Sequence, residues 1–271
     1  MKTNTRNIKL LPCAIAALAM GVAAPASSDE DDDDGLELPF SEARLYFELN
    51  NTDGDLGFHG LIDGDAWKRL EIEDPKEMKL LDVLVRGKLR KQGLTEIFFE
   101  SAEPTFDELA PEKFFKRFPE GVYEISGETL EGDELEAEVE VSHVMAAPPA
   151  DVMINGAGAA DGCDGELPVI EEGPYRISWS AVTMSHPTIG TPGEPVEVEQ
   201  YELVAEIERE DATPEVLKVS AVLPSHVTSF ELPEDFTDLA EGELKFEIIA
   251  KLDNGNQTAV ESCFLTEAEG D

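Results

Sequence analysis

Apolar and polar residues alternate with a period of two along several segments of residues 36–147, as in strands with one buried face. The alternating apolar positions are Leu45, Phe47 and Leu49; Leu81, Val83, Val85 and Leu89; and Leu135, Ala137, Val139 and Val141. Such alternation is typical of antiparallel sheets with one wet face. The phenylalanine-rich stretch between Pro111 and Pro119 predicts one short helix in this otherwise β region.

The same alternation returns in the second half of the chain. Its apolar positions are Tyr175, Ile177 and Trp179; Tyr201, Leu203, Ala205 and Ile207; and Phe246, Ile248, Ala250 and Leu252. Segments rich in turn-forming residues divide these runs, as in a seven-strand sandwich. Both halves of the chain are therefore expected to be β-sandwiches.

A run of small residues and prolines, Met145–Ala150, separates the two halves and has the composition of a linker. About 245 residues follow the N-terminal leader described below, a length that favours two domains over one. We predict a β-sandwich-like domain over residues 36–147 and a second domain over residues 148–271. The first resembles a sandwich of immunoglobulin or jelly-roll type, without pointing to one family.

Motifs in the second domain resemble those of fibronectin type III domains. Tyr175–Trp179 is similar to that family's second strand with its core tryptophan, and Val198–Leu203 to its third strand. Asp253–Asn256 is similar to the last hairpin, where an Asn-Gly turn is favoured. The resemblance covers residues 148–267, and Leu244 stands where the family has a corner tyrosine. Together with the alternation in the first half, it implies an all-β protein of two β-sandwich domains, the C-terminal one fibronectin type III-like.

The first 26 residues have the parts of a secretory signal peptide. Lys2, Arg6 and Lys9 supply positive charge, an apolar run follows, and small residues precede a cleavage point after Ala26. A retained membrane anchor is the alternative, although the apolar run is short for a membrane span. We expect an exported protein, secreted or periplasmic, with no membrane span once the signal is removed.

The charge of the chain is strongly acidic. The whole sequence has 20 basic and 60 acidic residues, and removing the leader leaves 17 basic residues and a net charge of −43. The acidic run Asp29–Asp34 makes residues 27–35 a disordered tail. A field of this sign repels phosphate backbones, which excludes nucleic acid as a partner.

Two cysteines, Cys163 and Cys263, follow the leader. One disulfide is the simple expectation for an exported protein, and two separate buried thiols are the alternative. The fibronectin-like resemblance implies that the loop holding Cys163 and the last strand holding Cys263 lie at the same pole of the domain. No zinc-type spacing of cysteine and histidine is present.

The candidate metal ligands are acidic and amide side chains around glycines. Calcium needs six to eight oxygen ligands, and such segments supply them. The candidates are Asn51, Asp53, Asp55, Asp63 and Asp65. Leu56 and Ile62 replace the glycine and the glutamate of an EF-hand, so only a looser calcium site shared by two loops is considered. The alternative is that both Asp-Gly segments are hairpin turns.

No catalytic motif is visible in the sequence. The HExxH and GxSxG patterns are missing, and Gly156–Ala160 lacks the following helix that a dinucleotide-binding loop needs. We therefore hypothesise an exported non-enzymatic binding or structural module that acts through protein or glycan contacts. A secreted hydrolase with its site in the first domain, and an extracellular calcium-binding protein, are the alternatives. No cofactor other than calcium is suggested.

Overall fold

The regular secondary structure of the described residues is almost entirely β-strand, which confirms the expected all-β class. It is a computed structural model that describes residues 36–170, 173–209, 213–240 and 242–266. The predicted signal peptide and acidic tail lie outside these residues. In the part of the chain described, no helix is long and apolar enough to cross a membrane.

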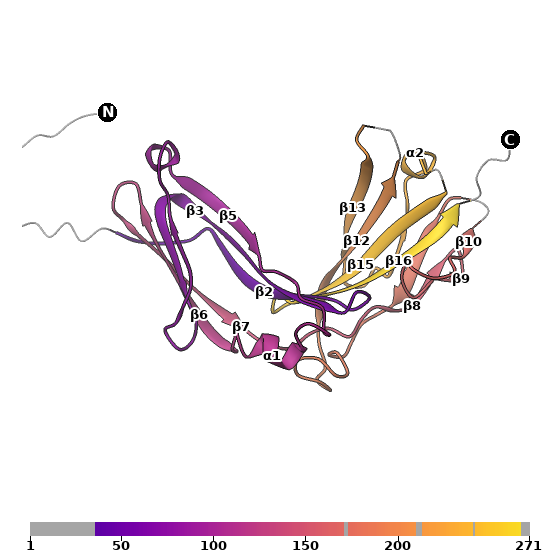
Figure 1. Ribbon diagram of the computed structural model, residues 1–271, viewed down its shortest axis with the longest axis horizontal. Coiled ribbons are helices and arrows are strands. Elements are labelled where there is room, and N and C mark those ends of the chain that lie inside the picture. Colours follow the sequence, from indigo (N-terminus) through magenta and orange to yellow (C-terminus); the bar gives the residue numbers. More distant parts are fainter. Residues whose placement is uncertain (1–35, 171–172, 210–212, 241, 267–271) are drawn as a thin grey trace, which may run out of the picture. The chain divides into compact units, whose positions relative to one another are not determined.

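One long sheet runs through the described chain in the order β1-β7-β6-β3-β2-β16-β15-β12-β13 (Figure 1). Strands β4 and β5 also pair with β3, and β10 pairs with β16. The strands from the first half are β1 (Glu37–Pro39), β2 (Glu42–Asn50), β3 (Asp55–Glu73), β4 (Lys79–Leu84), β5 (Leu94–Glu100), β6 (Gly121–Thr129) and β7 (Glu134–Val141). Those from the second half are β10 (Val169–Ile170), β12 (Val198–Glu208), β13 (Val216–Pro224), β15 (Glu243–Leu252) and β16 (Gln257–Thr266).

Strand β3 takes part in two portions of this sheet because it is 19 residues long. Its first residues pair with β2 and β5, and its last residues pair with β4 and β6. The register with β5 shifts between Asp63 and Trp67, and such irregularities bend a strand. Gly64 lies at this bend, where a Cβ atom would come within 2.8 Å of the Phe40 ring.

The first half encloses a core rich in aromatic residues. Trp67 and Tyr123 are fully buried, and the ring of Phe58 stacks on that of Phe118 with centroids 4.6 Å apart. The predicted helix is α1 (Pro111–Phe115), which buries Phe114 and Phe115 against this core. The alternation thus marked the correct face on β2 and β7.

One sequence expectation fails in this half. The period-two pattern extended the strand of Leu81 and Val83 to Leu89, but β4 ends at Leu84. Gly87 has a φ of 63° and a 3-10 turn follows at Leu89–Lys91. Arg90 and Lys91 lie in this exposed turn, because the positive φ of Gly87 ends the extended backbone before them.

The second half is a sandwich whose core lies between two sheets. A four-stranded sheet in the order β14-β11-β8-β9 supplies one layer, and β12, β13, β15 and β16 supply the other. The four-stranded sheet contains β8 (Ala150–Ile154), β9 (Ala157–Gly158), β11 (Arg176–Ser180) and β14 (Ser229–Glu231). Trp179 is 5 % exposed and its ring centroid lies 5.4 Å from that of Tyr201, so the expected core tryptophan is confirmed. A short helix, α2 (Glu234–Thr237), precedes β15.

The two cores are separate, although the sheet is shared. Met145 belongs to the first core and Ala146 to the second, within the predicted linker. Residues 257–259 of β16 pair in parallel with residues 48–50 of β2. The domain boundary at residue 147 stays a prediction.

Buried Asn256 links the two halves by hydrogen bonds. Its Oδ1 accepts the Phe47 N–H at 2.9 Å, and its Nδ2 donates to the carbonyls of Ser142 at 2.8 Å and Val144 at 2.9 Å. Asn256 is 1 % exposed, so these partners replace water for its amide group. The last hairpin therefore contacts both β2 and the segment after β7.

Candidate functional site

The turn between β2 and β3 carries the candidate ligands Asn51, Asp53 and Asp55, and the side chain of the preceding Asn50 holds it. Asn50 Oδ1 accepts the backbone N–H groups of Thr52 at 3.0 Å and Asp53 at 3.2 Å. Asn50 Nδ2 donates to Asp53 Oδ2 at 2.9 Å. These bonds are typical of turns built on Asn and Asp, and they support the hairpin-turn alternative.

The structure does not bring the five candidate calcium ligands together. Asp55 pairs with Asn50 at one end of the β2–β3 ladder, and Asp63 pairs with Glu42 at the other. Eight residues of extended strand span about 26 Å. Asp55 and Asp63 therefore cannot bind one calcium ion together. The sequence suggested two neighbouring loops, but β3 is an extended strand from one residue to the other.

Other contacts already engage several of these side chains. Asn51 Oδ1 lies 3.1 Å from Nε2 of His186, and Asp63 Oδ2 accepts the Ser41 hydroxyl at 3.0 Å. Asp65 is exposed on β3. Calcium binding by the protein stays a prediction. Calorimetric titration with calcium, comparing the parent with an Asp53→Ala/Asp55→Ala variant, tests it.

The edge of β16 that faces away from β15 is covered by several different groups. Thr52 Oγ1 accepts the Glu261 N–H at 2.9 Å and donates to the Glu261 carbonyl at 3.3 Å. A disulfide joins Cys163 to Cys263, with Cα atoms 5.0 Å apart, as the two-cysteine count predicted. The Leu265 N–H donates to the Pro168 carbonyl at 2.9 Å, next to the short pairing with β10.

Two adjoining cavities open along this edge, and we call them together the β16 groove. One, of about 530 Å³, is lined by Thr52, Asp53, Glu261 and residues 159–166. The other, of about 610 Å³, shares Thr52 and Glu261 and extends to Pro148–Val152. The disulfide and the Thr52 hydrogen bonds fix the two walls against β16, so the groove is preformed.

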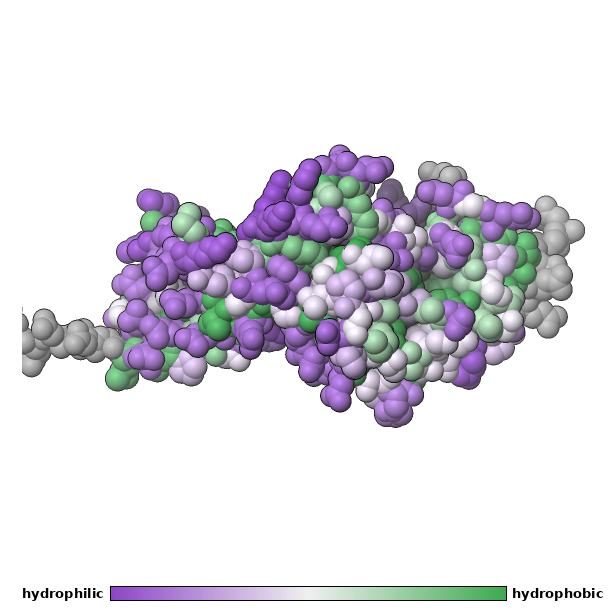
Figure 2. Space-filling model, turned by 90° about the horizontal axis from the view of Figure 1, so that it is seen from below, coloured by the Kyte–Doolittle hydropathy of each residue, from purple (hydrophilic) through white to green (hydrophobic). Residues whose placement is uncertain are grey.

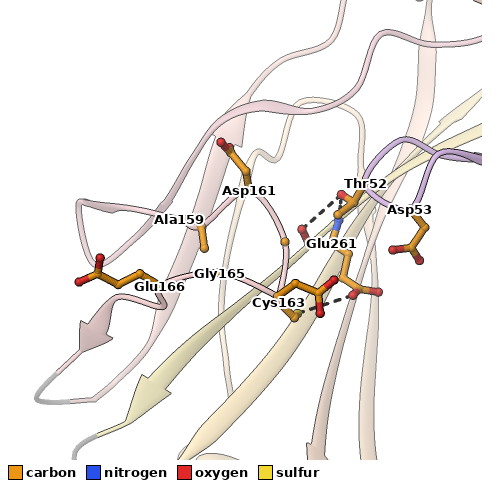
Figure 3. A pocket seen from close by; sticks show the side chains of 11 residues that line it. Thr52, Asp53, Ala159, Asp161, Cys163, Gly165, Glu166 and Glu261 are labelled. Carbon is orange, nitrogen blue, oxygen red and sulfur yellow. Dashed lines mark hydrogen bonds between the residues drawn. The ribbon is translucent and has the colours of Figure 1, made fainter.

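The lining of the groove is acidic. Its carboxylate residues are Asp53, Asp151, Asp161, Asp164, Glu166 and Glu261. No lysine, arginine or histidine lines either cavity within the described ranges. In Figure 3 the side chains of Asp161 and Glu166 point away from Thr52 and Glu261 on the opposite wall, and both residues are exposed. Glu261 has a cation nearby, since its Oε2 lies 2.5 Å from Lys245 Nζ.

A second acidic region lies on the wet face of the long sheet. Burial raises the pKa of Asp55 to about 6, and the carboxylates of Glu103 and Asp53 add to the rise. Burial raises the pKa of Glu247 to about 7, with further contributions from Glu48 and Glu261. Strands far apart in the sequence bring these groups together, so the sequence alone could not identify them.

His59 is the buried member of this region. It is 3 % exposed, and its Nε2 lies 3.0 Å from Glu103 Oε1. A Cβ atom on Gly57 would come within 2.2 Å of that carboxylate oxygen and 2.7 Å of Nε2, so glycine at position 57 makes room for the pair. His59 stood out in the sequence only as one of four scattered histidines. The cavities described for residues 36–266 are not lined by this pair.

Cys163, Cys263 and Glu243 lie close enough together to resemble a metal-binding group. Both sulfur atoms are in the disulfide, however, and thiolates are what a metal binds. This group is therefore not a metal site in the oxidised protein.

Comparisons with known proteins give a limited result. No family model and no curated protein matches the sequence. Among solved structures, the chain is similar to the tetra-tandem repeat in the extending region of a large adhesion protein, with 12 % identity and a TM-score of 0.27. The match covers 84 % of this chain, which spans about half of that one (50 %).

Two other solved structures resemble the chain to a similar degree. Tp47, the 47-kilodalton lipoprotein of Treponema pallidum, has 10 % identity and a TM-score of 0.32, over 83 % of this chain and 50 % of that one. The FN1–FN3 domains of chicken CNTN1 have 11 % identity and a TM-score of 0.27, over 85 % and 68 %. At these values the similarities do not bear on function.

Proposed function

We propose that this protein is an exported, non-enzymatic binding or structural module that acts through contacts with a protein or a glycan. The observation that carries the proposal is the β16 groove. It is preformed, it is open to solvent, and acidic side chains line it without a neighbouring catalytic motif. Ligand sites are usually concave and largely preformed, and polar groups at fixed positions set their specificity.

The strand order of the second half supports a fibronectin type III-like module. Three strands in the order β14-β11-β8 oppose four in the order β16-β15-β12-β13, with Trp179 between the layers. Leu244, at the place of the family's corner tyrosine, is fully buried in that core. This fold positions the groove at one margin of the sandwich, while fold alone does not assign a ligand.

The chemistry of the groove selects the kind of ligand. Carboxylates accept hydrogen bonds from lysine and arginine side chains and from sugar hydroxyls. Figure 2 shows one face of the molecule, on which hydrophilic residues are interspersed with paler and hydrophobic ones. A basic protein segment or a neutral glycan fits this groove, and a polyanion does not.

A triple variant that replaces three groove carboxylates with uncharged amides tests the proposal. Asp161→Asn/Asp164→Asn/Glu166→Gln removes three exposed carboxylates from the lining. Glu96→Gln/Glu112→Gln/Glu131→Gln is the matched control, because it removes three exposed carboxylates elsewhere. The mature protein is applied to a glycan array and to an array of basic peptides. We expect ligands that bind the parent and the control and lose at least tenfold in affinity for the groove variant, roughly 1.4 kcal/mol. Equal binding by both variants would show that the groove is not the binding site.

A hydrolase is the second candidate, favoured by the raised pKa of Asp55 beside Glu103. A carboxyl with a pKa of about 6 is still partly protonated in mildly acidic solution, where it can act as a general acid. Release of reducing sugar from a panel of polysaccharides, measured for the parent and for Asp55→Asn, separates the two functions. Activity in the parent that is lost in the variant would favour the enzyme over the binding module.

A further inference from the structure

Strand β13 forms one end of the long sheet and has an open edge. It pairs with β12 over nine consecutive residues without a bulge, and it has no second partner strand among the described residues. The Arg209 N–H donates to the Glu215 carbonyl at 2.8 Å, which identifies that pair as hydrogen-bonded. Hydrogen-bonded pairs alternate along an antiparallel ladder. The backbone groups of Val216, Lys218, Ser220 and Val222 therefore point to the open side.

The polar side chains of β13 do not protect this edge. Natural proteins guard edge strands with charges, prolines or bulges, because open backbone groups recruit other strands. Lys218 Nζ lies 2.5 Å from Glu206 Oε1 on β12, and the Ser220 hydroxyl donates to Glu202 on the same strand. Both side chains thus turn back over β12. Val216 and Val222 stay exposed, at 45 % and 60 %.

The segment 216–222 is complementary to a second copy of itself. An antiparallel pairing about a two-fold axis at Val219 places Val216 opposite Val222 and Lys218 opposite Ser220 of the other copy. Leu217 then lies opposite Ala221, a large residue against a small one. The two exposed valines meet each other, and the lysines are not directly opposed. Cross-strand pairs of this kind are what stabilise a sheet.

We propose that β13 is a dimerisation edge, at which a second copy of this chain extends the long sheet through an isologous antiparallel pairing. The charge of the chain favours this edge over other surfaces for self-association. Residues 216–222 hold one lysine and no carboxylate, in a chain of net charge −40. Repulsion between the two acidic copies opposes the contact at low salt, and salt screens it. Dimerisation is therefore stronger at high ionic strength.

Sedimentation of the mature, oxidised chain in 0.1 M and 2 M NaCl measures this equilibrium. We expect the dimer dissociation constant to fall roughly tenfold or more at the higher salt concentration. Ser220→Pro removes one outward N–H and leaves the bonds to β12, so we expect a folded monomer. Ser220→Ala keeps the N–H and is expected to dimerise. A parent that is monomeric at both salt concentrations would overturn the proposal.

A cysteine scan tests the register even where the proline variant does not fold. Under mild oxidation, Val219→Cys is expected to form a disulfide-linked dimer, because the two copies of residue 219 face each other across the axis. Ala221→Cys lies opposite Leu217 and is expected to stay uncrosslinked. Equal crosslinking at both positions, or none at position 219, would contradict this pairing.

Discussion

The two margins of the larger sheet in the second half, β16 and β13, differ in how their backbone groups are covered. On β16, the edge turned away from β15 is closed by β2, the Thr52 side chain, the disulfide and β10. On β13, the outward groups have no partner strand in the described structure. The covered edge joins the two halves of the chain and forms one wall of the groove. The open edge is left available for another chain.

This difference shows that a sheet edge can serve two purposes in one molecule. Covering β16 requires residues from the first half, from the loop before β10 and from a disulfide, so it stabilises the arrangement of the whole described chain. Among the residues that the structure describes, nothing comparable covers β13, where the local sequence is what limits pairing. The following predictions test how strongly the covered edge is held.

Removal of the disulfide is expected to cause the largest loss in the free energy of unfolding. Cys163→Ala/Cys263→Ala opens a connection between residues 100 positions apart, which costs about 4 kcal/mol in the chain-entropy description. Urea unfolding of the parent and the variant measures this loss. Reductant should lower the parent's stability and leave the variant unchanged, and a loss under about 1 kcal/mol would contradict the prediction.

Asn256→Ala is expected to cost about 3 kcal/mol, because it leaves the buried N–H of Phe47 and carbonyl of Ser142 without the side chain that bonds them. Chemical unfolding provides the measurement. Asn254→Ala is the control, since Asn254 is less buried than Asn256. Its Nδ2 donates to the Val144 carbonyl at 3.1 Å, and its Oδ1 accepts the Asn256 N–H at 2.9 Å. An equal loss of stability in both variants would contradict the prediction that the buried bonds of Asn256 contribute more than those of Asn254.

Thr52→Val should cost about 1–2 kcal/mol, because valine keeps the shape of threonine and removes the hydroxyl that bonds both backbone groups of Glu261. Thr52→Ser keeps that hydroxyl and is expected to stay near the parent. Hydrogen exchange of the Glu261 amide gives a local readout. Unchanged protection in Thr52→Val would mean that the hydroxyl does not seal the edge.

The smallest change in stability is expected from Glu247, which lies on β15 between the β16 and β13 edges of the sheet. The pKa of Glu247 is raised to about 7 in the folded protein, so its stabilising contribution is fully present below the ordinary glutamate pKa and is lost as the pH rises through about 7. Glu247→Gln should therefore melt about 2–4 °C higher than the parent at pH 8. At pH 4 the two should melt together, and a gain of equal size at both pH values would exclude titration as its cause.

Several local features were predictable from the sequence for simple reasons. Alternation on β2, β7, β12 and β15 identified the buried faces, because side chains on a strand alternate between core and solvent. The short helix at Pro111 followed from its bounding prolines and its phenylalanines. The pattern failed at Gly87, where one backbone conformation ended a strand that the side chains would have continued.

The candidate site was less accessible to sequence reasoning. The pairing of Cys163 with Cys263 was expected, but the groove beside it depends on Thr52, which comes from the first half. The calcium hypothesis grouped Asp55 with Asp63 because they are close in sequence, whereas an extended strand places them far apart. The proximity of Glu247 to Glu48 likewise required knowing that β16 lies beside β2.

By itself, the sequence predicted the all-β class, the acidic charge, a disulfide as the simple expectation for two cysteines, and most of the residues that point into each core, since these follow from composition and from the period of a strand. Only the tertiary structure decided that one sheet runs through both halves, that β16 is covered and that β13 is open. Strand neighbours are chosen by contacts between residues far apart in the chain, and no local pattern records which edges will meet.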